Sequence, residues 1–332
     1  MNAASRPLAL IADIGGTNAR FALTDPVTDA PEIIEPRTLA TAEYASLQHA
    51  AEHYLAEVGA RPDSAAIAVA SPVHGEEIRL TNRAWSFTRG ELKQALGLRR
   101  LAVINDFGAV SWAVPALQPD DYVTLHGRDD APLQGPVSII GPGTGLGVAL
   151  LVGDAQRGWN VVETEGGHVS FAPLGDEEQM IARWLTARFG RVSTERVLCG
   201  AGLSYVDAIL RSDGHAPPDV ALRDPAEIVA AALEGHDVIA RRALARFCAV
   251  LGSVVGDTAL IHGARTVMIA GGMVPRFIPF LRSSAFRERF LAKGRFVAYL
   301  ESMTIRVITH PNPGLLGAAV AARTALQAES PR

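Results

Sequence analysis

The chain has 332 residues, 48% hydrophobic and 20% charged, which is a globular composition with enough apolar material for about two domains. Its 31 Lys and Arg against 35 Asp and Glu give a net charge of −4 without a long basic run, so no nucleic-acid partner is expected. No signal peptide and no membrane-spanning stretch are recognisable, and Cys199 and Cys248 are the only cysteines. These features favour a protein of the reducing cytoplasm over a membrane or disulfide-linked protein.

The first predicted element is a β-hairpin with a glycine-rich turn. In "LALIADIGGTNARFALTD" (8–25), an apolar run is followed by a Gly-Gly-Thr-Asn turn and a second β-rich run. "VSIIGPGTGLGVALLVGD" (137–154) repeats this order well over a hundred residues later. Two such segments predict two halves built on one plan.

Two further strands are expected between the hairpins. "AAIAVASPV" (65–73) and "LAVINDF" (101–107) are predicted to be buried, and the second contains Asn105 and Asp106 after an apolar run. A carboxylate in such a place loses hydration and needs compensating partners. Two interpretations of Asp106 are open: it caps a helical turn over residues 108–111, or it serves in a catalytic site.

The remaining predicted elements are four helices and one strand. Residues 175–190 begin with acids, carry apolar residues at helical spacing and end at a glycine, which suits the helix dipole. An Asp-Pro pair begins the helix predicted over 224–235, and a long apolar helix is expected over 236–262. A strand within 266–272 precedes a last helix over 312–327, whose small residues predict close packing against a sheet.

The two glycine-rich turns are candidate phosphate-binding segments. Asp13 precedes "GGT" (15–17) in the first turn, and Thr144 lies among the glycines of the second. Glycine lets backbone N–H groups approach anionic oxygens, and threonine adds a hydroxyl donor. One such turn alone is typical of an ordinary hairpin, but two matching turns predict a nucleotide held by both. Neither turn matches a P-loop or a dinucleotide-binding fingerprint.

Several ionisable residues near these segments have two interpretations each. Asp13 either holds Mg²⁺ near the phosphates or accepts hydrogen bonds from turn N–H groups. Glu195 either binds a ligand or belongs to the first turn of a short helix after residues 193–194. Glu165 and His168 flank a glycine pair, and a single histidine is more often structural than catalytic. No zinc-ligand spacing joins these residues.

Seven segments, taken in chain order between residues 12 and 319, carry a family resemblance. They are "ADIGGTNARFAL", "INDF", "GPGTGLGVA", "EGGHVSFAP", "ERVLCGAG", "IAGGMVPRF" and "NPGLLGAA". Together they resemble the bacterial glucokinase family, in its branch without zinc. The resemblance implies an α/β protein with the two-lobed actin-like ATPase (ribonuclease H-like) fold, each lobe a mixed β-sheet with helices and a cleft between. The implied small lobe is 1–115 plus 310–332, and the large lobe is 116–309.

The resemblance also implies a reaction. ATP would phosphorylate the 6-hydroxyl of D-glucose, which gives glucose 6-phosphate and ADP in the first step of glycolysis. Asp106 would be the catalytic base, and Mg²⁺ would bind at Asp13. The residues implied to bind glucose are Asn105, Asp106, Glu165, His168 and Glu195. Those implied to bind ATP are Ala12, Asp13, Ile14, Gly15, Gly16, Thr17, Gly143, Thr144, Gly145, Gly271 and Gly272.

The chemistry of these side chains agrees with that reaction. Carboxylates accept hydrogen bonds from sugar hydroxyls, and Asn and His can both accept from and donate to them. Phosphoryl transfer needs alignment, Mg²⁺, phosphate-stabilising donors and a base for the attacking hydroxyl. The family is commonly dimeric, so a homodimer is expected. Two cysteines cannot supply the cysteine-rich zinc motif of the related repressor and kinase branch.

Other functions stay open at this point. A kinase for another hexose or an amino sugar would share most of the ligands. Ser170 and Ala201 stand where the family often has an acid and a proline, so substrate specificity is less firmly implied than the reaction. A non-kinase actin-like ATPase or a sugar-responsive repressor is less favoured. The first glycine-rich segment begins by residue 12, which leaves no room for a helix-turn-helix.

Overall fold

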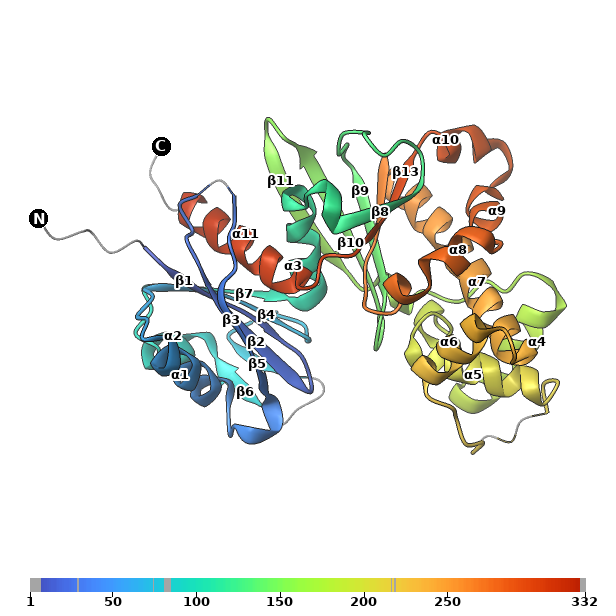
Figure 1. The fold of residues 1–332 in the computed structure, drawn as a ribbon, viewed down its shortest axis with the longest axis horizontal. Helices are drawn as coiled ribbons and strands as arrows, with labels where there is room; N and C mark the ends of the chain where they lie inside the picture. The colour runs from blue at the N-terminus through green and yellow to red at the C-terminus, as the bar shows by residue number, and fades with distance from the viewer. Residues whose placement is uncertain are drawn as a thin grey trace, which may run out of the picture. The chain divides into compact units, whose positions relative to one another are not determined.

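The computed structural model describes residues 7–328 apart from 29, 74, 81–84, 216 and 218. These residues form two compact units, each built on one main β-sheet with helices (Figure 1). Unit 1 combines Met1–Pro119 with His310–Arg332, and unit 2 is Asp120–Thr309. The predicted α/β class is therefore confirmed.

The main sheet of unit 1 has the strand order β3-β2-β1-β4-β7. Its strands are β1 (Ala9–Ile14), β2 (Asn18–Thr24), β3 (Ile34–Ala40), β4 (Ser64–Val69) and β7 (Arg100–Asn105), and a separate ribbon pairs β5 (Glu77–Arg79) with β6 (Ser86–Thr88). β1 pairs antiparallel with β2, as predicted for the first hairpin, and parallel with β4, which pairs parallel with β7. The carboxyl ends of three parallel strands therefore share one edge of the sheet.

Helices cover both faces of this sheet (Figure 1). They are α1 (Leu47–Val58), α2 (Arg89–Ala95), α3 (Asp106–Ala113) and α11 (Pro313–Ala328). Leu10 and Ile14 of β1 belong to one apolar cluster with residues of α1 and α2. Ala9 and Ile11, which point to the opposite face, cluster with α11. The alternation of side chains along β1 thus joins both helical layers to one strand.

Small residues let α11 approach its neighbours closely, as the sequence predicts. The buried residues of α11 in this cluster are Leu315, Ala318, Ala319, Ala321 and Ala322. A Cβ on Gly317 would overlap the carbonyl oxygen of Ala109 in α3. Glycine is therefore required where α11 crosses α3.

Strand β7 differs from its prediction. The sequence predicts a buried strand over 101–107, but Val103 is the one buried residue of β7. β7 is the edge strand of the sheet, so it has a neighbouring strand on one side alone. Its position at the edge leaves Asn105 and Asp106 partly accessible at its carboxyl end.

Unit 2 repeats the plan of unit 1 in the order β11-β10-β9-β12-β13-β8. Its strands are β8 (Tyr122–His126), β9 (Val137–Pro142), β10 (Leu146–Asp154), β11 (Gly158–Thr164), β12 (Thr266–Ile269) and β13 (Thr304–Ile308). β9 pairs antiparallel with β10 and parallel with β12, as β1 does with β2 and β4. The predicted second hairpin and the repeated plan are both confirmed.

The helices of unit 2 form most of its core. They are α4 (Gly175–Phe189), α5 (Gly200–Arg211), α6 (Pro225–Glu234), α7 (Val238–His262), α8 (Ile278–Ser283), α9 (Phe286–Leu291) and α10 (Val297–Glu301). α4, α6, α7 and α11 match the four predicted helices closely.

Both units also contain short 3₁₀ helices. They are η1 (Thr41–Glu43), η2 (Val114–Ala116), η3 (Pro119–Asp121), η4 (Gly166–His168), η5 (Thr194–Arg196), η6 (Val274–Phe277) and η7 (Gly294–Phe296).

Helix α7 is long and apolar enough to cross a membrane, although the sequence analysis expects no such stretch. In the described structure, 72% of its most apolar window is buried inside the protein. Its residues Phe247 and Leu251 are fully buried in the main cluster of unit 2. α7 is therefore explained as a core helix.

Candidate functional site

The candidate residues of unit 1 lie at the carboxyl edge of its parallel strands. In the sheet register, Ile14 of β1 pairs with Val69 of β4, and Val69 pairs with Asn105 of β7. Neighbouring strands are about 4.8 Å apart, so the ends of β1 and β7 are about 10 Å apart. Asp13 and Asp106 therefore lie at the same edge, where open α/β sheets usually bind ligands.

Asn105 fixes the start of α3. Its side-chain oxygen accepts hydrogen bonds from Phe107 N at 2.9 Å and Gly108 N at 3.2 Å, and its amide donates to Ser71 O at 3.3 Å. The helix cap is thus Asn105, whereas the sequence analysis considered Asp106 for that role. Asn105 holds both the helix and the end of β4 in place.

Asp106 is the first residue of α3. Its Oδ1 accepts a hydrogen bond from Phe107 N at 2.8 Å, and the side chain is partly exposed. The N-terminus of a helix attracts negative charge because its N–H dipoles point outward. The Asp106 carboxylate is therefore held in place at this edge of the sheet by its own helix.

Asp13 is mostly buried beside a guanidinium. Its side chain is 21% exposed, and its Oδ2 lies 3.3 Å from Arg20 Nη1. Burial raises the pKa of the Asp13 carboxyl, and the charge of Arg20 opposes that rise. Sequence reasoning missed Arg20. The hairpin does predict this contact, because Asp13 and Arg20 are direct cross-strand partners.

Gly314 is a second residue that sequence reasoning missed. It lies in the first turn of α11, and a Cβ there would be 2.7 Å from Asp13 Cγ and 2.8 Å from Oδ2. Real Cβ atoms essentially never come so close to another heavy atom. The glycine of "NPGLLGAA" therefore leaves room for the Asp13 carboxylate. The sequence motif alone does not show this contact.

The first glycine-rich turn is fastened from outside the hairpin. Gly15 N donates to Asn18 O at 2.9 Å, which closes the turn. Thr41 Oγ1 lies 2.9 Å from Gly16 O and 3.0 Å from Thr17 O, so its hydroxyl engages the turn carbonyls. Because Thr41 contacts both carbonyl oxygens, it fixes the backbone of the turn. Sequence reasoning missed Thr41, which lies far along the chain.

In unit 2, three glycine-containing segments meet. Gly143 N donates to Gly145 O at 2.8 Å, and Gly200 N, at the start of α5, donates to Gly143 O at 2.9 Å. Gly271 has a φ of +89°, and a Cβ on it would overlap Pro142 O. Glycine is therefore required at 271, and the two segments predicted to contact ATP in this unit, 143–145 and 271–272, lie together.

The three sugar candidates of unit 2 form a row. His168 Nδ1 is 3.8 Å from Glu195 Oε1, and His168 Nε2 is 3.7 Å from Glu165 Oε2. The side chain of Glu165 is 76% exposed, that of His168 is 57% exposed and that of Glu195 is 28% exposed. Thr194 N donates to Val169 O at 2.9 Å, which holds η5 against η4. His168 is therefore not a buried structural histidine.

Glu195 also contacts the second glycine-rich turn. Its Oε2 accepts a hydrogen bond from Leu146 N at 2.9 Å. A Cβ on Gly145 would lie 2.5 Å from the same oxygen. The local prediction for Glu195 is also confirmed, because it lies in the first turn of η5 after the cap Ser193. The Glu195 carboxylate is thus both a candidate ligand for the sugar and a hydrogen-bond partner of the second glycine-rich turn.

The described residues contain no group of three or more His, Cys, Asp or Glu side chains that could hold a metal ion. Asp13 contributes one carboxylate. Mg²⁺ in phosphoryl-transfer sites is usually held by one or two carboxylates together with substrate phosphates and water. The site therefore suits a Mg²⁺ ion that arrives with a nucleotide.

Comparisons with known proteins agree along nearly the whole chain. A family model described as Glucokinase matches residues 10–325. The glucokinase of Citrobacter koseri is 43% identical over 96% of this chain and 98% of that protein. The glucokinase of Yersinia pestis (strain Pestoides F) is 44% identical over 93% of this chain and 94% of that protein. A crystal structure of a glucokinase from an Antarctic psychrotroph is 35% identical, with a TM-score of 0.84 over 96% and 99% of the two chains.

Proposed function

The chain belongs to the glucokinase family and phosphorylates glucose with ATP, and we propose that it acts on the 6-hydroxyl with Asp106 as the general base. Its fold is the actin-like ATPase fold of the sugar kinases, as the resemblance implied. The observation that carries the proposal is the placement of Asp106. It follows β7 directly, at the sheet edge that also holds Asp13.

In the proposed reaction, Asp106 takes the proton of the sugar 6-hydroxyl. The sugar oxygen forms a bond to the γ-phosphorus of ATP, the bond from that phosphorus to the β,γ-bridging oxygen breaks, and ADP leaves. Asn105 supports this step because it caps α3 and so fixes the backbone from which Asp106 projects. Catalysis of this kind depends mostly on alignment and on charge stabilisation.

Five residues are proposed to bind glucose. Asn105 and Asp106 come from unit 1, and Glu165, His168 and Glu195 come from unit 2. The row formed by the last three presents carboxylate and imidazole groups that can pair with neighbouring hydroxyls. Their partial exposure supports the proposal, because a ligand can reach them without displacing core residues.

ATP is proposed to contact the two glycine-rich turns, at 12–17 and 143–145, together with Gly271 and Gly272. Support comes from Thr41, which fixes the first turn, and from Gly200, which fixes the second. Mg²⁺ would be held near Asp13, where it would neutralise developing charge on the phosphates. Chelation should abolish activity, and added Mg²⁺ should restore it.

A sugar panel tests this function. ADP release is measured with glucose, mannose, fructose, galactose and N-acetylglucosamine, and with 6-deoxyglucose. We expect glucose to have the highest kcat/KM, and NMR of the product to place the phosphate on O6. 6-Deoxyglucose should compete with glucose without being phosphorylated. Preference for another sugar would overturn the glucose assignment, and sugar-independent ADP release would indicate a non-kinase ATPase.

We also propose a cytoplasmic homodimer. Both cysteines are buried free thiols, which suits a reducing compartment. Light scattering of the purified protein should give twice the 35.1 kDa mass of one chain. A mass of one chain at micromolar concentration would contradict the dimer without affecting the catalytic proposal.

A further inference from the structure

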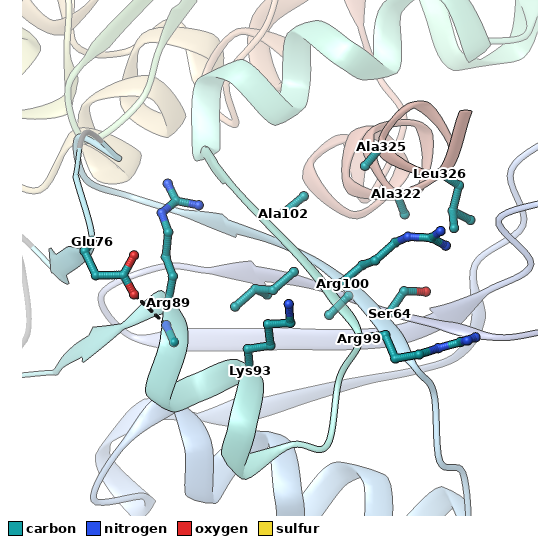
Figure 2. A pocket seen from close by; sticks show the side chains of 13 residues that line it. Ser64, Glu76, Arg89, Lys93, Arg99, Arg100, Ala102, Ala322, Ala325 and Leu326 are labelled. Atoms are coloured by element: carbon teal, nitrogen blue, oxygen red, sulfur yellow. Dashed lines mark hydrogen bonds between the residues drawn. The ribbon is translucent and has the colours of Figure 1, made fainter. Parts of the chain in front are cut away.

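We propose that unit 1 carries a second ligand site, a cationic pocket that binds a small organic phosphate monoester. The cavity has a volume of about 330 Å³ and lies between α2, β7 and α11 (Figure 2). Its lining residues are Ser64, Ala65, Glu76, Arg89, Gly90, Lys93, Arg99, Arg100, Leu101, Ala102, Ala322, Ala325 and Leu326. This volume is in the range of small-molecule sites.

The pocket is separate from the site of phosphoryl transfer. Its β7 contribution comes from Arg100 and the two residues after it, whereas Asn105 ends the strand. A strand rises about 3.3 Å per residue, so Arg100 is about 16 Å from Asn105, and Ala102, the nearest of the three, is about 10 Å from it. Neither Asp13 nor Asp106 lines the pocket. A ligand here would leave the proposed catalytic groups uncovered.

Positive charge is concentrated in this pocket, although the chain as a whole is acidic at −4. Four of its lining residues, Arg89, Lys93, Arg99 and Arg100, are cationic, and Glu76 is the one acid among them. The Glu76 carboxylate accepts a hydrogen bond from Gly90 N at 2.7 Å. The lining therefore keeps a positive excess, which attracts anions.

The partners of these cations show which of them can meet a ligand. The Arg89 guanidinium donates to Val73 O at 2.8 Å and Gly75 O at 3.1 Å, so it is fixed in place by groups without formal charge. Arg99 is paired with Asp63. Within the part of the chain that the structure describes, Lys93 has no ion pair. Arg100 also has an interaction of its own. In Figure 2, Lys93 reaches into the space between α2 and α11.

The opposite wall of the pocket is apolar. It is formed by Ala102 of β7 with Ala322 and Leu326 of α11, together with Ala325 and Leu101. An inorganic anion would leave this wall unused. A phosphate monoester presents a dianion to the cations and a carbon skeleton to the wall, so it uses both halves of the lining. Sugar phosphates, including the product of the reaction, and triose phosphates share this chemistry.

Calorimetric titration tests the proposal on the full chain. Glucose 6-phosphate and glycerol 3-phosphate are titrated separately into protein saturated with glucose, with inorganic phosphate as a third probe. We expect saturable binding of at least one ester, weaker at 0.5 M salt than at 0.05 M salt, and weaker binding of inorganic phosphate. Equal affinity for inorganic phosphate, or no saturable binding, would overturn the proposal.

Matched variants locate the binding. Lys93→Gln should weaken ester binding about 10- to 100-fold, the effect expected for loss of one hydrogen bond to a charged group. Arg37→Gln is the control, because Arg37 lies exposed on β3 at the opposite edge of the same sheet. It should bind the ester like the parent. Both variants should keep the parent's glucose phosphorylation rate and melting temperature, since both side chains are exposed.

Two outcomes separate this proposal from the catalytic one. If Lys93→Gln binds the ester as tightly as the parent, the ester occupies another site and the pocket assignment is wrong. If glucose phosphorylation fails while ester binding still depends on Lys93, the catalytic proposal fails and the pocket stands.

Discussion

Replacing Asp106 with Asn separates a catalytic role from a structural one. Asn keeps the size of the side chain and an oxygen that can accept the 2.8 Å hydrogen bond from Phe107 N. It removes a negative charge from the first turn of α3, whose interaction with the helix dipole contributes about 0.3–1 kcal/mol. The Asn105 cap is untouched. The free energy of unfolding should therefore fall by no more than about 1 kcal/mol.

The expected effect on the rate is much larger. Loss of a general base typically lowers a rate by about 10² to 10⁴, which corresponds to about 3 to 5 kcal/mol in the activation barrier. Coupled measurement of ADP gives kcat, and urea unfolding gives the free energy of unfolding. ATP binding should be unchanged, whereas glucose binding should weaken, because the carboxylate accepts from the hydroxyl before reaction.

Asn105→Ala provides the reverse comparison. This substitution removes the side chain that caps α3 and should cost about 0.5–2 kcal/mol of stability. The Asp106 variant should thus be the more stable and the less active of the two. A well-folded Asp106→Asn protein whose kcat lies within a few-fold of the parent would refute the assignment of Asp106 as the base.

Two further changes probe other parts of the site, and a third probes the acid stability of the fold through Asp237, the residue that caps α7. Gly314→Ala places a Cβ 2.7 Å from Asp13 Cγ, so the KM for ATP should rise and the free energy of unfolding should fall by about 1–3 kcal/mol. A more stable variant with a normal KM would show that this close contact does not matter. Glu195→Gln keeps an acceptor for Leu146 N and should weaken glucose binding about 10- to 100-fold with ATP binding unchanged, whereas Glu195→Ala should weaken both in titration calorimetry. The Ala240 N–H, with Arg211 and Arg223, lowers the pKa of Asp237 to about 2, so its ionised form stabilises the fold above about pH 4. That stability should be lost as the pH falls from about 4 to 2, and Asp237→Asn, which can still cap α7, should flatten this part of the acid-unfolding curve.

Local patterns allowed much of the fold to be predicted. Each glycine-rich turn lies between two apolar runs that need no distant partner to be recognised, and both became hairpins. The edge position of β7 could not be predicted, because it depends on which strand ends the sheet. The run over 101–107 is apolar enough for a central strand, so composition alone suggested burial.

The candidate site was less accessible to sequence reasoning. Arg20 follows from the hairpin register, but the contacts of Thr41 and Gly314 join segments that are far apart along the chain. No spacing rule places His168 beside Glu195; their association came from the family resemblance, and the structure brings them within 3.8 Å. Their role in binding glucose stays a prediction.

The packing of α11 has a consequence for protein synthesis. Ala9, Ile11 and Ala66 on the sheet of unit 1 are covered by α11, which leaves the ribosome after all of unit 2. The whole of unit 2 is translated in between, which takes roughly 10–40 s at about 5–20 residues per second. During that interval the nascent chain can complete unit 2 but leaves one apolar face of the first sheet uncovered. Gly314 also arrives beside Asp13 only with this helix. The first glycine-rich turn therefore gains its final surroundings only after unit 2 has been translated, so a nascent chain stalled before α11 would be both inactive and prone to aggregate.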